Sequence, residues 1–192
     1  MKLEYIKSTD NWREVANHAR TTISMDKGKG EPSDSWKTKM LYAEHSPIRD
    51  LWIKWKWVDM KYWVSNHFVR HHIGFQAFVS SQRSDREHNN IYNRDKRPQD
   101  ALVNVECVAN TQSMINISRK RLCNQAHKET QQAWDMVIEG IKNIESQLYK
   151  LCVPECVYRG FCPEFKTCGF ADGYEFSKIR KNYINNLNSA RK

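Results

Sequence analysis

The chain lacks the features that mark membrane-spanning, secreted, repetitive or disordered proteins. No apolar run approaches the length of about 18 residues that a transmembrane helix needs, and the first residues show no hydrophobic region of a signal peptide. Internal repeats and low-complexity segments are also missing. Apolar residues nevertheless make up 40 % of the chain and aromatic residues 11 %, which excludes a disordered body. We therefore expect a soluble, cytoplasmic protein, or one of the host cytoplasm if its source is viral.

Acidic residues are in the minority. The 22 Asp and Glu stand against 31 Lys and Arg, so the formal net charge is +9. Such a charge favours an anionic partner: a nucleotide phosphate, a nucleic acid or a polyglutamate tail. The length of 192 residues suits one domain with a substantial core.

The cysteines lack the Cys-x2-Cys spacing that is typical of zinc knuckles. Cys107 and Cys123 stand alone among apolar residues, and we expect them to be buried free thiols. The other four fall in one stretch that also contains Gly and Pro: Cys152, Cys156, Cys162 and Cys168. Without a secretion signal, this group indicates reduced thiols or a metal site more than disulfides. Structural zinc and buried or paired thiols both remain open, and we assign no metal-binding residue.

The hydropathy pattern predicts an α/β (α+β) fold in a single domain. Helices are expected over residues 10–23, 35–44 and 61–71, strands over 51–58 and 75–82, and loops over 26–33 and 84–99. The first strand has one buried face, because Ile53, Trp55 and Trp57 alternate with lysines and other residues.

A long helix is expected to follow, from about Asn110 to Leu148, with an apolar stripe that includes Ala133, Val137 and Ile141. A helix of this length is unusual in a monomeric domain of this size, which suggests packing against a partner subunit. We divide the chain into one domain, 1–170, with a Cys-rich extension at 150–170, and a basic C-terminal tail, 171–192.

Two polar stretches are candidates for chemistry. The first runs from Asn66 to His72 and resumes at Ser80 to Arg83, and its arginines and histidines at a helix end suit an anion site. His67 and His71 are four residues apart and would share a helix face, as zinc ligands do. The Glu that follows the first His in metalloproteases is missing, so we favour structural or phosphate-binding histidines.

The second polar stretch lies along the predicted long helix and comprises Asn110, Ser113, Asn116, Arg121 and Glu129. Asn110 and Arg121 are eleven residues apart, about three helical turns, so both can contact one long ligand. A solvated helix face is the alternative that the pattern alone allows.

In this order, the two stretches resemble the motifs of the flavin-dependent thymidylate synthases. That family carries Arg-His-Arg, seven residues and Ser, which is similar to Arg70-His71-His72 followed by Ser80. Ser81-Gln82-Arg83 looks like the closing Ser-x-Arg of the motif, displaced by one residue. Upstream, His45-Ser46-Pro47 is similar to the family's His-x-Ser/Thr-Pro turn, with Arg49 in place of an acidic residue.

The resemblance continues downstream and covers residues 10–150. The family's Asn-x-Arg-Ser, Asn, Arg and Ala-Gln-x-Glu align without a gap with Asn110-Thr-Gln112-Ser113, Asn116, Arg121 and Ala126-His127-Lys128-Glu129. Arg94 precedes Pro98 as a substrate-binding Arg of the family does. The departures from the family pattern concern the flavin side, where His72 and Gln112 replace arginines. At His72 a neutral imidazole ring replaces the forked guanidinium of an arginine, which weakens binding of the flavin pyrophosphate.

The resemblance implies a fold, a reaction and roles for particular residues. It implies a small central sheet packed with long helices, a homotetramer, and reductive methylation of dUMP to dTMP with methylenetetrahydrofolate, FAD and NADPH. Arg121 would be catalytic, stabilising the ionised pyrimidine through the uracil carbonyl and N3. The residues that would bind substrate are His67, Ser80, Ser81, Arg83, Arg94 and Arg121. The residues that would hold the flavin are Ser46, Arg70, His71, His72, Asn110 and Asn116.

Three other interpretations are kept. A diverged relative would transfer a different one-carbon unit to a pyrimidine nucleotide with altered use of flavin, and a catalytically inactive homologue would only bind. A nucleic-acid-binding module would use the net charge and the Trp-Lys run at 52–57 to stack bases. We consider nucleic acid the weaker partner, because Trp55 and Trp57 share a face with Leu51 and Ile53.

Overall fold

A computed structural model describes residues 1–86 and 93–191 as a mixed α/β domain. Its four-stranded antiparallel sheet has the order β1-β2-β4-β3. The strands are β1 (Lys2–Ser8), β2 (Trp52–Lys61), β3 (Phe75–Val79) and β4 (Leu102–Asn110). The α/β fold class expected from the sequence is confirmed. The sequence interpretation named no strand at β1 or β4, although β4 alternates strictly, with Val103, Val105 and Cys107 buried.

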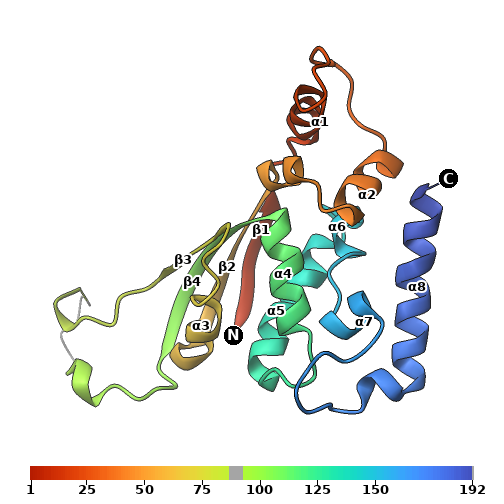
Figure 1. Cartoon of the computed structure of the whole chain (residues 1–192). Coiled ribbons are helices and arrows are strands. Elements are labelled where there is room, and N and C mark those ends of the chain that lie inside the picture. The colour runs from red at the N-terminus through yellow and green to blue at the C-terminus, as the bar shows by residue number, and fades with distance from the viewer. Residues whose placement is uncertain (87–92, 192) are drawn as a thin grey trace.

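The helices lie beside the sheet and beyond its end (Figure 1). They are α1 (Trp12–Thr21), α2 (Asp34–Tyr42), α3 (Tyr62–Phe68), α4 (Thr111–Arg121), α5 (Lys128–Ile141), α6 (Ser146–Tyr149), α7 (Glu155–Arg159) and α8 (Tyr174–Arg191). Short 3-10 turns are η1 (Ser46–Asp50), η2 (Ser84–Arg86), η3 (Arg94–Lys96) and η4 (Phe170–Asp172).

Tryptophans of β2 form the centre of the core. Trp55 and Trp57 are fully buried, as the alternation predicted, and their rings contact each other edge to face. Trp134 of α5 packs on Trp55, and Phe68 of α3 packs on Trp57 at 4.7 Å between ring centroids. Because Trp55 and Trp57 are enclosed here, neither is available to stack nucleic-acid bases.

The single long helix predicted from Asn110 to Leu148 is wrong. α4 ends at Arg121, the chain turns through residues 122–127, and α5 begins at Lys128. The His127 Nδ1 caps the new helix by accepting from the Glu129 N–H at 3.3 Å. The turn lets both helices bury apolar side chains in one core, including Met114 of α4 and Trp134 of α5. The lengths of α4 and α5 therefore give no reason to expect a partner subunit.

The segment expected as a basic tail, 171–192, contains the end of η4 and the whole of α8. α8 packs along α2 and α7, and the Tyr42 hydroxyl donates to the Tyr183 carbonyl at 3.0 Å. The proposed division of the chain at residue 170 stays a prediction. No helix in the described ranges is both long enough and apolar enough to cross a membrane.

Candidate functional site

Arg121 lies at the last residue of α4, against the chain that leaves α3. Its Nε–H donates to Nε2 of His71 at 3.0 Å, and its Nη2 donates to the His67 carbonyl at 2.5 Å. The His67 ring is within hydrogen-bonding distance of the Thr130 hydroxyl of α5, with 2.7 Å between Nδ1 and Oγ1. We call these four residues, Arg121, His67, His71 and Thr130, the Arg121 cluster. The guanidinium is thus held by α3 and the turn that follows it, a segment distant from Arg121 in the sequence.

Electrostatics favour neutral histidines in this cluster. Burial lowers the pKa of His71 to about 4, with the Arg121 and His72 charges as further causes. Burial, then Arg121, also lowers the pKa of His67. A neutral His71 can accept at Nε2 from Arg121 while its proton resides on Nδ1. Arg121 therefore carries the fixed positive charge of the cluster.

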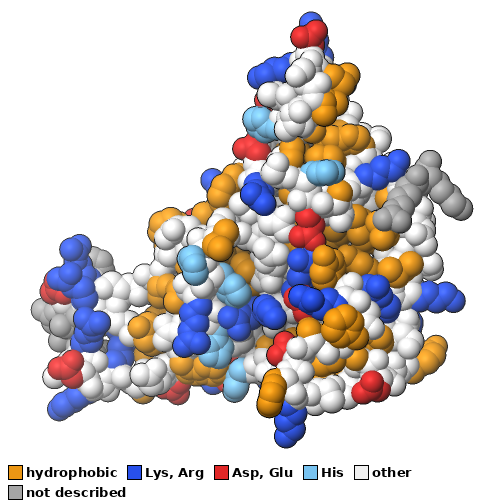
Figure 2. All heavy atoms as spheres, viewed as in Figure 1, with side chains coloured by type: hydrophobic (Ala, Val, Ile, Leu, Met, Phe, Trp, Pro, Cys, Tyr) orange, Lys and Arg blue, Asp and Glu red, His pale blue; other side chains and the backbone are white. Residues whose placement is uncertain are grey.

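Lys, Arg and His side chains gather on the face around α3 and the end of α4, as Figure 2 shows. Burial and the neighbouring Arg70 lower the pKa of Arg121, but an arginine stays charged at neutral pH. Arg70 and His72 are exposed at the turn that follows α3. This face is suited to an anionic ligand.

A second feature is an open recess of about 430 Å³ along the N-terminal half of α4. Its lining residues are Glu44, Arg49, Ile73, Asn110, Gln112, Ser113 and Asn116. We call it the α4 recess. It joins the Arg121 cluster through the chain at residues 71–74, because His71 lies in the cluster and Ile73 lines the recess.

Gly74 holds this connecting chain against α4. Its carbonyl accepts from the Asn110 N–H at 2.8 Å, and the Ser113 hydroxyl donates to the neighbouring Ile73 carbonyl. The φ of Gly74 is +65°, and an added Cβ would lie 2.4 Å from the Asn110 Nδ2. Both the backbone conformation and the close approach therefore require glycine.

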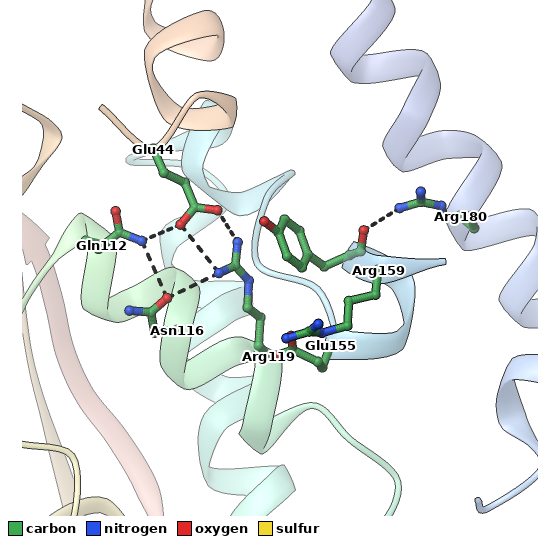
Figure 3. Close-up of polar contacts among 8 residues, drawn as sticks. Glu44, Gln112, Asn116, Arg119, Glu155, Arg159 and Arg180 are labelled. Atoms are coloured by element: carbon green, nitrogen blue, oxygen red, sulfur yellow. Dashed lines mark hydrogen bonds and ion pairs between the residues drawn. The ribbon is translucent and has the colours of Figure 1, made fainter. Parts of the chain in front are cut away.

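Three residues that line the recess, Glu44, Gln112 and Asn116, form a polar network with Arg119 (Figure 3). Arg119 of α4 forms an ion pair with Glu44, and its Nη1 lies 3.3 Å from the Asn116 Oδ1. The Gln112 Nε2 donates to Glu44 at 2.5 Å and lies 3.4 Å from the Asn116 Oδ1. The guanidinium carbon of Arg119 lies 3.6 Å from the centre of the Tyr158 ring of α7.

Three of the six predicted flavin residues, Ser46, Arg70, His71, His72, Asn110 and Asn116, belong to these two features. Asn110 and Asn116 line the α4 recess, and His71 belongs to the Arg121 cluster. Asn110 also has a structural task, because its Oδ1 accepts from the Ser113 N–H as the N-cap of α4. Ser46 is exposed at the start of η1.

The predicted substrate residues divide into two groups. His67 and Arg121 are together, whereas the segments at residues 81–86 and 93–97, which carry Ser81, Arg83 and Arg94, extend away from the helices (Figure 1). The Arg83 guanidinium is paired with both oxygens of Asp85. Ser80 bonds within the sheet, where its hydroxyl accepts from the Asn104 N–H at 3.0 Å.

Sequence reasoning missed Arg119, which contacts Glu44 and Asn116 of the recess lining, and Tyr158, which packs on Arg119. Arg119 belongs to the run Arg119-Lys120-Arg121, and its helical position three residues after Asn116 was an available signal. Tyr158 gave no signal, because its contact with Arg119 depends on how the chain returns after α6.

The cysteines are all free thiols. Cys152 is buried, whereas Cys123, Cys156, Cys162 and Cys168 line one small recess. Cys107 is buried as predicted, and Cys123 is partly exposed. Within residues 1–86 and 93–191, no group of three or more His, Cys, Asp or Glu is positioned to hold a metal ion.

Two larger recesses exist elsewhere. One, of about 510 Å³, lies between α1, the following loop and α2, and the other, of about 550 Å³, lies between α5, α6 and α8. Neither contains a predicted site residue, so the α4 recess and the Arg121 cluster are the candidate site.

Comparison with solved structures identifies the fold of this chain. No protein-family model matches the chain, and no curated protein matches it by sequence. A Helicobacter pylori flavin-dependent thymidylate synthase ThyX complexed with FAD and dUMP is similar in structure, with a TM-score of 0.60 and 12 % identity over 80 % of this chain and 100 % of that chain. A second structure of the H. pylori enzyme with FAD and dUMP has a TM-score of 0.61 and 13 % identity, over 79 % of this chain and 97 % of that one.

A UMP/dUMP methylase, PolB from Streptomyces cacaoi bound with 5-Br dUMP, is also similar, with a TM-score of 0.59 and 8 % identity over 78 % of this chain and 92 % of that chain. The chain therefore has the fold of the flavin-dependent thymidylate synthases, which confirms the resemblance at the level of fold.

Proposed function

We propose that this chain is a diverged flavin-dependent thymidylate synthase, which methylates C5 of a pyrimidine nucleotide, with dUMP as the substrate. The observation that carries the proposal is the Arg121 cluster, a fixed cation at the site where the sequence resemblance places the catalytic arginine. The structures with the same fold, which are of nucleotide methylases with bound dUMP or 5-Br dUMP, support it.

Arg121 has the chemistry that this reaction needs. Forming a carbon–carbon bond at C5 requires electron density on that carbon, and a cation beside the carbonyl and N3 of the uracil ring stabilises the ionised ring. Neutral His71 and the His67 carbonyl hold the guanidinium without neutralising it. The C5 hydrogen then leaves as a proton after the new bond has formed.

The α4 recess fits a flat heteroaromatic ring with a polar edge. It offers the apolar side chain of Ile73 and the amides of Gln112 and Asn116. We propose that it holds the flavin of FAD, with Arg49 supplying a positive charge in the recess. The bound flavin would supply the hydride after reduction by NADPH, and methylenetetrahydrofolate would supply the carbon. His71 connects the recess to the Arg121 cluster and would keep the two ligands adjacent.

Assembly of several copies would complete the site. Ser81, Arg83 and Arg94, the predicted phosphate-binding residues, lie on the projecting segments and not beside Arg121 (Figure 1). We propose that the protein is a homotetramer in which these segments reach the Arg121 cluster of another copy. The chain would then act in the cytoplasm on dUMP and folate.

Release of tritium from dUMP labelled at C5 tests the proposal. The purified chain is incubated with methylenetetrahydrofolate, FAD and NADPH, and we expect release of tritium into water together with formation of dTMP. Omission of each component in turn assigns its role. Release without dTMP would point to transfer of a different one-carbon unit, and no release by folded protein that contains FAD would overturn the proposal.

A further inference from the structure

Thr130 of α5 is the member of the Arg121 cluster to which the sequence resemblance assigns no role. We propose that Thr130 is a positioning residue that fixes the ring and the proton of His67. His67 then offers an N–H to an oxygen of the bound nucleotide and does not act as a base. The role of Thr130 follows from the geometry of this chain, and the identity of the ligand rests on the proposed function.

The hydroxyl of Thr130 determines which nitrogen of His67 carries the ring proton. Thr130 is fully buried, and its Oγ1 lies 2.7 Å from the His67 Nδ1. Among the described residues this hydroxyl has no second hydrogen-bond partner. If the His67 Nδ1 were the donor, the hydroxyl hydrogen would be buried without an acceptor, which costs free energy. Thr130 therefore donates, and the Nδ1 accepts.

The charges around His67 keep its ring neutral. Burial lowers the pKa of His67, and the charges of Arg121 of α4, Arg70 after α3 and His127 before α5 lower it further. A neutral imidazole carries one proton on its two nitrogens. Because the Nδ1 accepts a hydrogen bond, this proton resides on the Nε2 of His67.

The His67 ring is held on a second side by Trp63 of α3. The Trp63 indole contacts it edge to face, with 5.6 Å between ring centroids, and contacts the His127 ring in the same way at 4.5 Å. The Nε2 of His67 has no hydrogen-bond partner within the described ranges, and the residue is only partly buried. Because Arg121 and Arg70 are the neighbouring cations, this N–H suits an anionic or carbonyl oxygen as its acceptor.

This arrangement gives His67 two tasks in binding and none in proton transfer. Its carbonyl accepts from the Arg121 Nη2, so the backbone of His67 holds the guanidinium while its ring faces the nucleotide. With the Nδ1 engaged by Thr130 and the Nε2 protonated, the ring has no free lone pair that could take the C5 proton. His67 therefore contributes to binding of the nucleotide and not to removal of that proton.

Nitrogen NMR of the chain labelled at its histidine nitrogens tests the tautomer without any ligand. In the wild type we expect the His67 proton on Nε2 and the His71 proton on Nδ1, because the Nε2 of His71 accepts from Arg121. His67→Gln and His71→Gln variants assign the two sets of signals. Thr130→Val removes the hydroxyl at similar size, so the Nδ1–H form of His67 should become populated. Thr130→Ser should restore the wild-type signals, and Thr130→Ala gives the same comparison if the valine is not accommodated.

Binding and kinetics test whether the His67 ring donates to the nucleotide. We expect Thr130→Val to weaken dUMP binding, measured by calorimetry, about two- to tenfold, the range of one hydrogen bond. The kcat from tritium release should stay within about twofold of the wild type, because only binding is affected. In a His67→Ala background, Thr130→Val should have no further effect on affinity, since Thr130 acts through that ring.

Thr38→Val is the matched control. Thr38 is a buried threonine of α2, and its hydroxyl donates to the Asp34 carbonyl of the same helix at 2.7 Å. Like Thr130→Val, this variant removes a buried hydroxyl that makes one hydrogen bond. Because α2 lies apart from the Arg121 cluster (Figure 1), it should change neither the tautomer of His67 nor the affinity for dUMP.

The outcomes separate this inference from the proposed function. A wild-type His67 proton on Nδ1, or a Thr130→Val variant with unchanged affinity for dUMP, would overturn the inference and leave the proposed function standing. A large fall in kcat with unchanged affinity would assign proton transfer to His67 and would overturn the inference as well. If the folded wild type binds no dUMP, the proposed function is overturned, while the NMR signals still decide whether Thr130 fixes the proton of His67.

Discussion

Arg121 and His71 form a hydrogen bond in which the arginine Nε–H donates to the histidine Nε2 at 3.0 Å. The bond requires a neutral His71, and it joins the end of α4 to the chain that follows α3. A cation held by a neutral partner keeps its full charge for a ligand. This relationship underlies the first two predictions.

Replacing Arg121 by Ala should reduce turnover by at least about 10²-fold while the fold remains intact. The variant would lose the charge that stabilises the ionised pyrimidine. Within the protein it would lose only the hydrogen bonds to His71 and to the His67 carbonyl, so the fold should remain. Tritium release measures the activity, and circular dichroism with urea unfolding measures the fold. Lys120→Ala is the control, because Lys120 is exposed on the same turn. Near-normal activity of the Arg121 variant would contradict the assigned role.

Stability should depend on pH through His71. Burial lowers the folded-state pKa to about 4, below the unfolded value of about 6.5, so the unfolded state takes up a proton first. The contribution of His71 is fully present above pH 6.5 and is lost as the pH falls from about 6.5 to about 4. Urea unfolding of wild type and His71→Gln across this range should show the wild type losing more free energy of unfolding. Parallel curves would contradict the neutral, buried state of His71.

Gly74→Ala should lower the free energy of unfolding by about 1–3 kcal/mol, because a side chain at a φ of +65° is strained and the added Cβ would meet the Asn110 Nδ2 at 2.4 Å. The variant should also weaken the ligand of the α4 recess, since Ile73 and Asn110 would move apart. Gly30→Ala, where a Cβ would meet nothing within 4 Å, is the matched control. Equal stability of the two variants would show that the turn at Gly74 does not need glycine.

Trp134→Ala should destabilise the fold by about 3–5 kcal/mol, the range for deleting a large aromatic side chain from a core. The Trp134 ring lies between Trp55 and Phe68, and its Nε1 donates to the Ser118 hydroxyl at 3.0 Å. Trp134→Phe should cost less, because it keeps most of the packing and loses that hydrogen bond. Urea unfolding followed by circular dichroism gives both values, and a small effect of the Ala variant would place Trp134 outside the main core.

The local pattern predicted those elements whose burial is decided by their own residues. Alternation of Ile53, Trp55 and Trp57 was sufficient for β2, because the sheet buries that face against α3 and α5. The same rule applied to residues 102–110 would have found β4. The hydropathy pattern predicted one helix through residues 122–127, because a helical period does not reveal where the chain must turn back so that two helices share a core.

The candidate site was predictable in its parts and less so in its assembly. Arg121, His67 and His71, which the motifs singled out, contact one another, and their roles stay a prediction. The stacking of Arg119 on Tyr158 depends on how α7 returns to α4, which no local pattern records. The exposed positions of Arg83 and Arg94 likewise follow from the direction of the segments between β3 and β4, a property of the whole fold.

The visible absorption spectrum of the purified chain, recorded with FAD before and after addition of dUMP, shows whether flavin and nucleotide bind in adjoining sites. We predict bound flavin bands that shift when dUMP is added, because the α4 recess and the Arg121 cluster share the chain at residues 71–74. The Arg121→Ala variant should keep the flavin bands and lose the shift. A folded chain that binds dUMP without FAD, or binds neither, would contradict a flavin-dependent nucleotide methylase.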